Sequence, residues 1–188
     1  MQTYQPLTAD ELDEKLGWFL GHWRAIGMKN IEVFACRFSE KFGIREFPRD
    51  PREYLPRFGI AIERSQSHPE AEATWLRTGS IYTIAVSPLM AGPQIALKIY
   101  HELFEIMSAH PSFPEILPGP HEEKLATQFA VHLMMPAADV RAQAKALGHP
   151  AEDKSAVLAN RFGVSLSAMG IRLRELKIAP KRAPRKYY

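Results

Sequence analysis

The sequence contains a single cysteine, Cys36, among its 188 residues. One cysteine cannot form an intramolecular disulfide framework or a zinc site made of several thiolates. No apolar run approaches the roughly 18 residues that a membrane helix needs. The N-terminal stretch MQTYQPLTADELDEK is too polar and acidic for a secretory signal. These absences predict a cytoplasmic protein that does not enter a membrane, with Cys36 as a small buried hydrophobe.

The sequence also has little excess of charge. Its 24 Lys and Arg residues against 21 Asp and Glu residues give a net charge of +3. The basic excess lies in the C-terminal stretch KIAPKRAPRKYY, where nucleic acid could bind electrostatically or where the chain could simply end in solvent. The four cations at issue are Lys181, Arg182, Arg185 and Lys186. A hydrophobic content of 46% is ordinary for a folded domain with a sizeable core.

Hydrophobic periodicity predicts an α+β fold with a small antiparallel sheet. A capping box of Thr8 and Glu11 starts a first helix, and a second helix covers residues 30–43. Three strand-like runs follow, and Gly79 and Ser80 form a hairpin turn between the last two. The runs cover residues 59–65, 73–79 and 81–87; helices are then expected over 93–110, 121–135, 137–148 and, as a helix-turn-helix, 151–178.

The segment HELFE, residues 101–105, carries the chemistry of interest. Residues four apart on a helix are separated by about 40°, so His101 and Glu105 project side by side. Glu102 lies about 100° away and can reach the same cavity. Zinc proteases use this spacing in His-Glu-x-x-His, with two ligands on one stripe and a general base beside them. The helix is apolar nearly all round, so its ionisable groups should be buried, which is costly unless they are paired or bound to a cation.

A third ligand is expected from the helix over residues 121–135. Glu123 heads a face that continues through Ala126 and Ala130, and these two alanines permit close approach of a neighbouring helix. The proline-rich loop before it, PSFPEILPGP, would fold this helix back against the first. Glu122 points about 100° away and is expected to be a solvated charge at the helix start.

Other assignments of these residues stay open at this point. A helix with an ordinary Glu-rich face also contains such a five-residue pattern. Three other histidines lie near the site in the sequence: His110, His121 and His132. From helical geometry, we expect each of them to be a surface or helix-end residue rather than a metal ligand. The methionines of the region, Met107, Met134 and Met135, are expected to fill the core.

Two segments together resemble the ImmA/IrrE family of metallopeptidases. The family's hallmark is a His-Glu-x-x-His helix followed by Glu-x-x-Ala-x-x-Phe-Ala-x-x-Leu-Leu-Met-Pro. The second element is matched here at Glu123, Ala126, Phe129, Ala130, Leu133, Met135 and Pro136. LANRFGVSLSAMGIRLREL, residues 158–176, resembles the family's closing segment, so that the matches span about residues 80 to 178.

This resemblance implies a gluzincin-like zinc site and a peptidase activity. His101 and Glu123 would be zinc ligands, and Glu102 would be the general base. Family members typically cleave a helix-turn-helix transcriptional repressor and thereby switch on mobile-element or stress genes. A repressor of this kind is therefore the expected protein partner.

The sequence departs from the family pattern at two positions. Glu105 replaces the second His; because a carboxylate is a legitimate zinc ligand, Glu105 is predicted to bind the metal with His101 and Glu123. The added negative charge and hardness shift preference toward manganese or iron(II). Phe104 replaces a small residue and is expected to narrow substrate access.

The predicted function is therefore that of a metal-dependent endopeptidase, with Glu102 as the catalytic base. The alternative is a catalytically inactive regulatory protein that keeps the fold and binds a repressor or DNA. The run over residues 81–87 is the expected edge strand for an extended substrate. We predict a peptidase-like domain over residues 1–148 and a basic tail over 179–188.

Between them, a helix-turn-helix-like unit is predicted over residues 149–178. Such a unit could read DNA through its second helix, where Arg172 and Arg174 are available. It could equally serve as a packing lid or dock the repressor.

Overall fold

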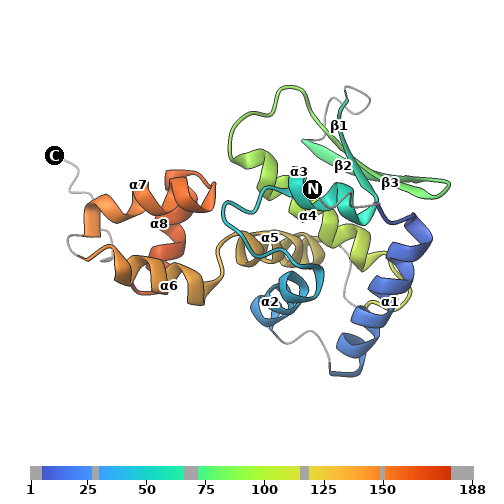
Figure 1. Cartoon of the computed structure of the whole chain (residues 1–188), viewed down its shortest axis with the longest axis horizontal. Helices are drawn as coiled ribbons and strands as arrows, with labels where there is room; N and C mark the ends of the chain where they lie inside the picture. Colours follow the sequence, from blue (N-terminus) through green and yellow to red (C-terminus); the bar gives the residue numbers. More distant parts are fainter. Residues whose placement is uncertain (1–5, 27–29, 66–71, 115–118, 149–150, 179–188) are drawn as a thin grey trace.

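A computed structural model describes residues 6–26, 30–65, 72–114, 119–148 and 151–178. It confirms the α+β class, with helices around one small sheet (Figure 1). The four tail cations, for which nucleic-acid binding and a solvated end were both open, lie outside the described residues. None of the helices in the described ranges combines the length and apolarity that crossing a bilayer requires.

The first two helices begin where the capping residues place them. In α1 (Ala9–Ile26), Thr8 N–H donates to Glu11 Oε2 at 2.7 Å, and Glu11 N–H donates back to Thr8 Oγ1 at 3.3 Å. Helix α2 (Ile31–Phe42) starts at Asn30, whose side chain accepts two backbone N–H groups, and ends at Gly43. Both helices contribute to an aromatic core in which the ring of Phe34 contacts five others: Phe19, Trp23, Phe104, Phe113 and Phe129.

The sheet is mixed rather than wholly antiparallel. Strands β2 (Ala73–Thr78) and β3 (Ile81–Val86) form the predicted hairpin, in which Trp75 pairs with Ile84. Strand β1 (Ile60–Arg64) pairs parallel to β3, so that the strand order is β1-β3-β2. The hairpin turn fixes only β2 against β3. The expectation that residues 81–87 form an edge strand is therefore wrong, because β3 is the central strand and β2 is an outer one.

A short helical segment leads into β1 and ties the sheet to α1. It consists of α3 (Pro51–Tyr54) and the 3₁₀ helix η1 (Leu55–Phe58). Gly59 ends η1 with φ +75°, and a Cβ there would overlap the carbonyl oxygen of Leu7. Ala9 N–H donates to Ser80 O at 3.0 Å, which anchors the start of α1 to the β2–β3 turn.

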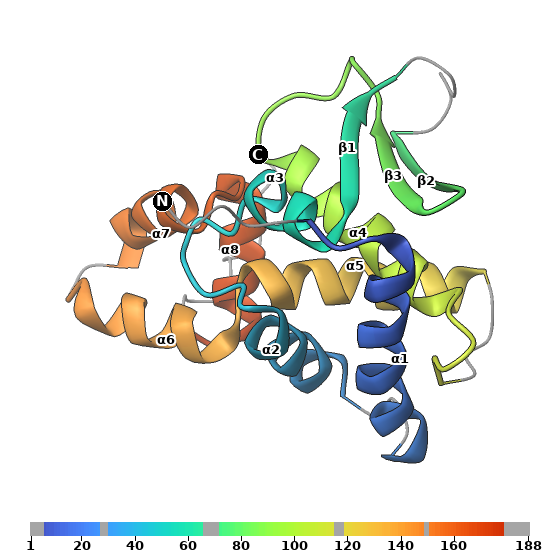
Figure 2. The same cartoon turned by 45° about the vertical axis from the view of Figure 1, so that its right-hand side comes forward.

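Two long helices pass beneath the sheet and cross the centre of the molecule (Figures 1 and 2). Helix α4 (Gln94–Ser108) packs against β2 and β3, and α5 (Pro120–Met134) packs against α4 and α2. On α5, Ala126 and Ala130 are fully buried and allow this close approach, as predicted. Phe104 is also fully buried and lies in the aromatic core, so the expectation that it narrows substrate access is wrong.

Three helices form the C-terminal end of the molecule, away from the sheet (Figure 1). They are α6 (Ala137–Ala146), α7 (Ala151–Phe162) and α8 (Leu166–Glu175), with Ser165 capping α8 through its side chain. Arg172 on α8 is only 3% exposed; its Nη2 lies 2.8 Å from Glu32 Oε1 on α2. The prediction that Arg172 is available to DNA is therefore wrong, whereas Arg174 is exposed.

Candidate metal centre

Helix α4 brings three of the predicted site residues together. Ligand atoms of His101, Glu102 and Glu105 all lie within 4.8 Å of one another. His101 and Glu102 are buried, at 4% and 3% exposure, and Glu105 is half-buried. His101 Nε2 lies 3.1 Å from Glu105 Oε1, which is the side-by-side arrangement expected of residues four apart.

Helix α5 adds Glu123 from the other side. Glu123 Oε2 lies 3.2 Å from the same atom, His101 Nε2. Two carboxylates from two helices therefore converge on one imidazole nitrogen. The side chain of Glu123 is 61% exposed, so this side of the cluster is open to solvent.

The other ring nitrogen of His101 faces a residue that the sequence analysis did not single out. Thr127, one turn after Glu123 on α5, has its Oγ1 3.3 Å from His101 Nδ1. A metal-binding histidine usually donates its second ring N–H to an oxygen acceptor, which fixes the tautomer and the ring orientation. The i+4 spacing from Glu123 was the signal that could have identified Thr127.

The charges around His101 are unbalanced. Lys98 Nζ lies 3.9 Å from Glu102 Oε1 and is the one cation of the described residues in ion-pair contact with these three carboxylates. Burial, and then the neighbouring Glu105, raise the pKa of Glu102 to about 7. The hydrogen bond to His101 lowers the pKa of Glu105. One imidazole and three carboxylates with a single lysine form a cluster that a divalent cation would stabilise.

The donor set fits a divalent ion. One imidazole nitrogen and carboxylate oxygens are ligands of zinc in proteins, and a carboxylate-rich set also suits manganese or iron(II). His101, Glu105 and Glu123 would hold the ion, because each of the two carboxylates places an oxygen within 3.2 Å of His101 Nε2. Glu102 lies beside His101 and Glu105 and contacts Lys98.

The other polar residues near α4 and α5 have structural contacts. His110 follows α4, where its Nε2 lies 3.1 Å from Asp13 O, and His121 is exposed at the start of α5. His132 lies in the last turn of α5, half-buried and 3.7 Å from Glu32, so it is a helix-end histidine, as predicted. Glu122 is half-buried and accepts a 2.5 Å hydrogen bond from Ser108 Oγ, rather than being a solvated charge. Cys36 is half-buried, not fully buried.

Comparison with known families decides the relationship. Residues 56–174, more than half of the chain, match peptidase family M78, described as the IrrE N-terminal-like domain. The chain belongs to this family. The IrrE N-terminal-like match includes the sheet, α4, α5 and most of the C-terminal helices, and it confirms the resemblance found in the sequence.

Two further comparisons delimit what is shared. The comparison with curated proteins finds no match. Among solved structures, a Mycobacterium tuberculosis transcriptional regulator has the same fold, with a TM-score of 0.52 and 19% identity over 86% of this chain. The chain spans about half of that regulator's length, 51%.

Proposed function

We propose that this IrrE-type chain is a metal-dependent endopeptidase that cleaves a helix-turn-helix transcriptional repressor. The observation that supports this most is the convergence of Glu105 and Glu123 on Nε2 of His101, with Glu102 buried beside them. A cluster serving only to join α4 and α5 would not need a surplus of carboxylates.

The residues of the cluster would have different roles in the reaction. His101, Glu105 and Glu123 would bind the divalent ion, which supplies Lewis-acid polarisation of the peptide carbonyl. Glu102 would accept the proton of the attacking water and pass it to the leaving amine. In the metal-free chain, burial and the neighbouring Glu105 raise the pKa of Glu102 to about 7, so this carboxyl can take up and release a proton near neutral pH. Thr127 would hold the His101 ring so that Nε2 faces the ion.

The substrate would bind beside the sheet. Strand β2 is an outer strand that packs against α4, and extended peptides commonly add to an exposed sheet edge. We therefore expect the segment being cleaved to lie extended along β2. The solved relative is described as a transcriptional regulator, which supports a regulatory protein as partner.

The test combines metal analysis with a cleavage assay. The protein is purified without chelators, and metal content and cleavage are measured with helix-turn-helix repressors and a proteome-derived peptide library as substrates. We expect about one metal equivalent for wild type, loss of metal in His101→Ala, and retained metal in the control His121→Ala. Glu102→Gln should keep the metal but cleave at least about a hundredfold more slowly, because an amide cannot accept the proton.

Two outcomes would overturn the proposal. Full metal content in His101→Ala would remove the ligand assignment. A wild-type protein that binds metal yet cleaves neither the repressors nor the peptides would be a non-catalytic regulatory protein.

A further inference from the structure

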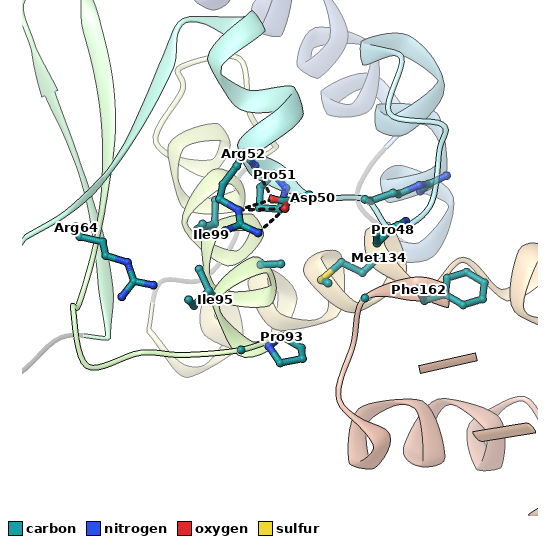
Figure 3. A pocket seen from close by; sticks show the side chains of 14 residues that line it. Pro48, Asp50, Pro51, Arg52, Arg64, Pro93, Ile95, Ile99, Met134 and Phe162 are labelled. Atoms are coloured by element: carbon teal, nitrogen blue, oxygen red, sulfur yellow. Dashed lines mark hydrogen bonds and ion pairs between the residues drawn. The ribbon is translucent and has the colours of Figure 1, made fainter. Parts of the chain in front are cut away.

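A second pocket lies beside the N-terminal half of α4. Its volume is about 380 Å³, and residues of α3, β1, the start of α4 and the α7–α8 turn line it (Figure 3). Ile95 and Ile99 face it from α4. None of His101, Glu102, Glu105 and Glu123 lines this pocket, so the pocket is separate from the metal site.

The pocket is strongly basic. Arg49, Arg52 and Arg64 line it, with Asp50 as the only acidic residue among the lining side chains of the described structure. Asp50 is already occupied: it caps α3 through Arg52 N–H and accepts from the Arg52 side chain at 2.5–3.1 Å. Arg64 donates to Pro88 O and Met90 O through Nη1. Figure 3 shows Arg52 and Arg64 reaching toward Ile99 and Ile95 from two sides.

Arg49 is a buried cation that forms no ion pair with a carboxylate of the described residues; Asp139 acts on it at longer range. It is 6% exposed, and its Nη1 donates to the carbonyl oxygen of Leu133 at 2.6 Å. No carboxylate of the described residues lies within ion-pair distance of it, and its buried Nε has no hydrogen-bond partner there. Burial lowers the pKa of Arg49. A buried charge without a counter-charge is costly, and an anion in the adjoining pocket would offset that cost.

The start of α4 adds a further positive potential. Pro93 precedes this 15-residue helix, and no side chain caps its N-terminus. Gly92, Pro93 and Ala96 from this terminus line the pocket. The first N–H groups of a helix have no partners within the helix, and they and the helix dipole attract anions.

We propose that this pocket binds a small organic anion with a phosphate or carboxylate group. The anionic group would lie between Arg52, Arg64 and the N-terminus of α4. The apolar part would lie against Ile95 and Ala96, which are half-buried and line the same space, with the fully buried Ile99 behind them. The volume falls within the range of small-molecule sites. Because Gly163 of the α7–α8 turn also lines the pocket, the ligand would contact both the C-terminal helices and the helix that carries His101.

The experiment measures binding of two probes, AMP as an organic phosphate and succinate as a dicarboxylate. Calorimetric titration and thermal shift are carried out at constant ionic strength, with sodium chloride as reference. We expect at least one probe to bind wild type and to raise its melting temperature. The double variant Arg52→Gln/Arg64→Gln should bind it at least about tenfold more weakly, because each arginine supplies a charge-assisted hydrogen bond. The control Arg141→Gln changes an exposed arginine of α6 outside the pocket and should bind like wild type.

The stronger probe identifies the anionic group. If the double variant does not fold, the single variant Arg52→Gln serves, because that side chain is 68% exposed. The proposal is overturned if neither probe acts beyond sodium chloride, or if the arginine variants bind the probe as well as wild type. Chelation of a metal at His101 would affect wild type and variants alike, so it cannot imitate the expected difference.

Discussion

Helix α5 carries two polar clusters at its two ends, and their charges are arranged differently. Near its start, Glu123 joins His101, Glu102 and Glu105, with Lys98 as the cation in ion-pair contact. Near its end, His132 lies beside Glu32 and Arg172, whose opposite charges are 2.8 Å apart. In the second cluster, Ala137 N–H donates to Glu32, and Arg172 Nε donates to Met135 O.

The difference separates a structural cluster from a site. The Glu32–Arg172 cluster neutralises its charges within the chain and joins α2, α5 and α8. The His101 cluster has a surplus of carboxylates, one of them buried with a raised pKa, and so is stabilised only by a proton or a cation from outside. Similar residue types therefore serve stability in one place and binding in the other.

The largest effect is expected from breaking the balanced cluster. Arg172→Met should lower the free energy of unfolding by about 3–4 kcal/mol, because it leaves Glu32 without its buried partner. Urea denaturation measures the loss, and adding Glu32→Gln should recover part of it. Arg174→Met, on the exposed side of α8, should change stability by less than about 0.5 kcal/mol. Equal losses in the two arginine variants would contradict a structural role for the pair.

In the His101 cluster of the metal-free protein, removing a charge should raise stability rather than lower it. Burial raises the pKa of Glu102 from 4.5 to about 7, so the folded state binds more protons than the unfolded state between these values. The stability that Glu102 contributes is therefore present at low pH and is lost as pH rises through about 7.

Glu102→Gln should remove this dependence. With chelator present, we expect the variant to be about 2–3 kcal/mol more stable than wild type near pH 8, with the difference vanishing toward about pH 4.5. The free energies of unfolding of the two proteins are compared at each pH. The contribution of His132 is the same in both and therefore drops out of the difference. A constant difference across this range would show that Glu102 is not held in an unfavourable ionised form.

A smaller effect is expected at the hydroxyl that orients His101. Thr127→Val removes the acceptor of His101 Nδ1–H and should weaken metal binding by about 10- to 100-fold. Competition with a chromophoric zinc chelator measures the affinity. Thr127→Ser keeps the hydroxyl and should bind metal almost like wild type. If valine and serine behave alike, Thr127 does not position the ring.

The smallest expected change comes from restoring the common ligand. Glu105→His removes one negative charge and adds an imidazole, and should tighten zinc binding by about tenfold while weakening the preference for manganese. It should also raise cleavage of the repressor. The control Glu122→His alters the acid beside Ser108 and should leave zinc binding unchanged. A folded Glu105→His protein that binds zinc no better than wild type would mean that position 105 does not face the metal.

Local patterns predicted much of the fold. The capping box at Thr8, the hairpin turn at Gly79 and the α4 and α5 helices all follow from residues close in sequence. The parallel pairing of β1 and the central place of β3 depend on contacts between distant segments, which no local pattern contains. For the same reason, two predictions about side-chain surroundings were wrong: Phe104 does not narrow substrate access, and Arg172 is not available to DNA.

The sequence by itself determined the candidate metal residues on α4 and the family of the chain, because helical spacing places His101 and Glu105 on one stripe wherever the helix lies. Only the tertiary structure decided which charges are balanced. Helix packing brings Glu123 and Thr127 to His101 and Glu32 to Arg172, and it leaves Arg49 buried with no carboxylate of the described residues in ion-pair contact. The physical reason is that the energy of a charge depends on its burial and its neighbours, and both are set by segments far apart in the chain.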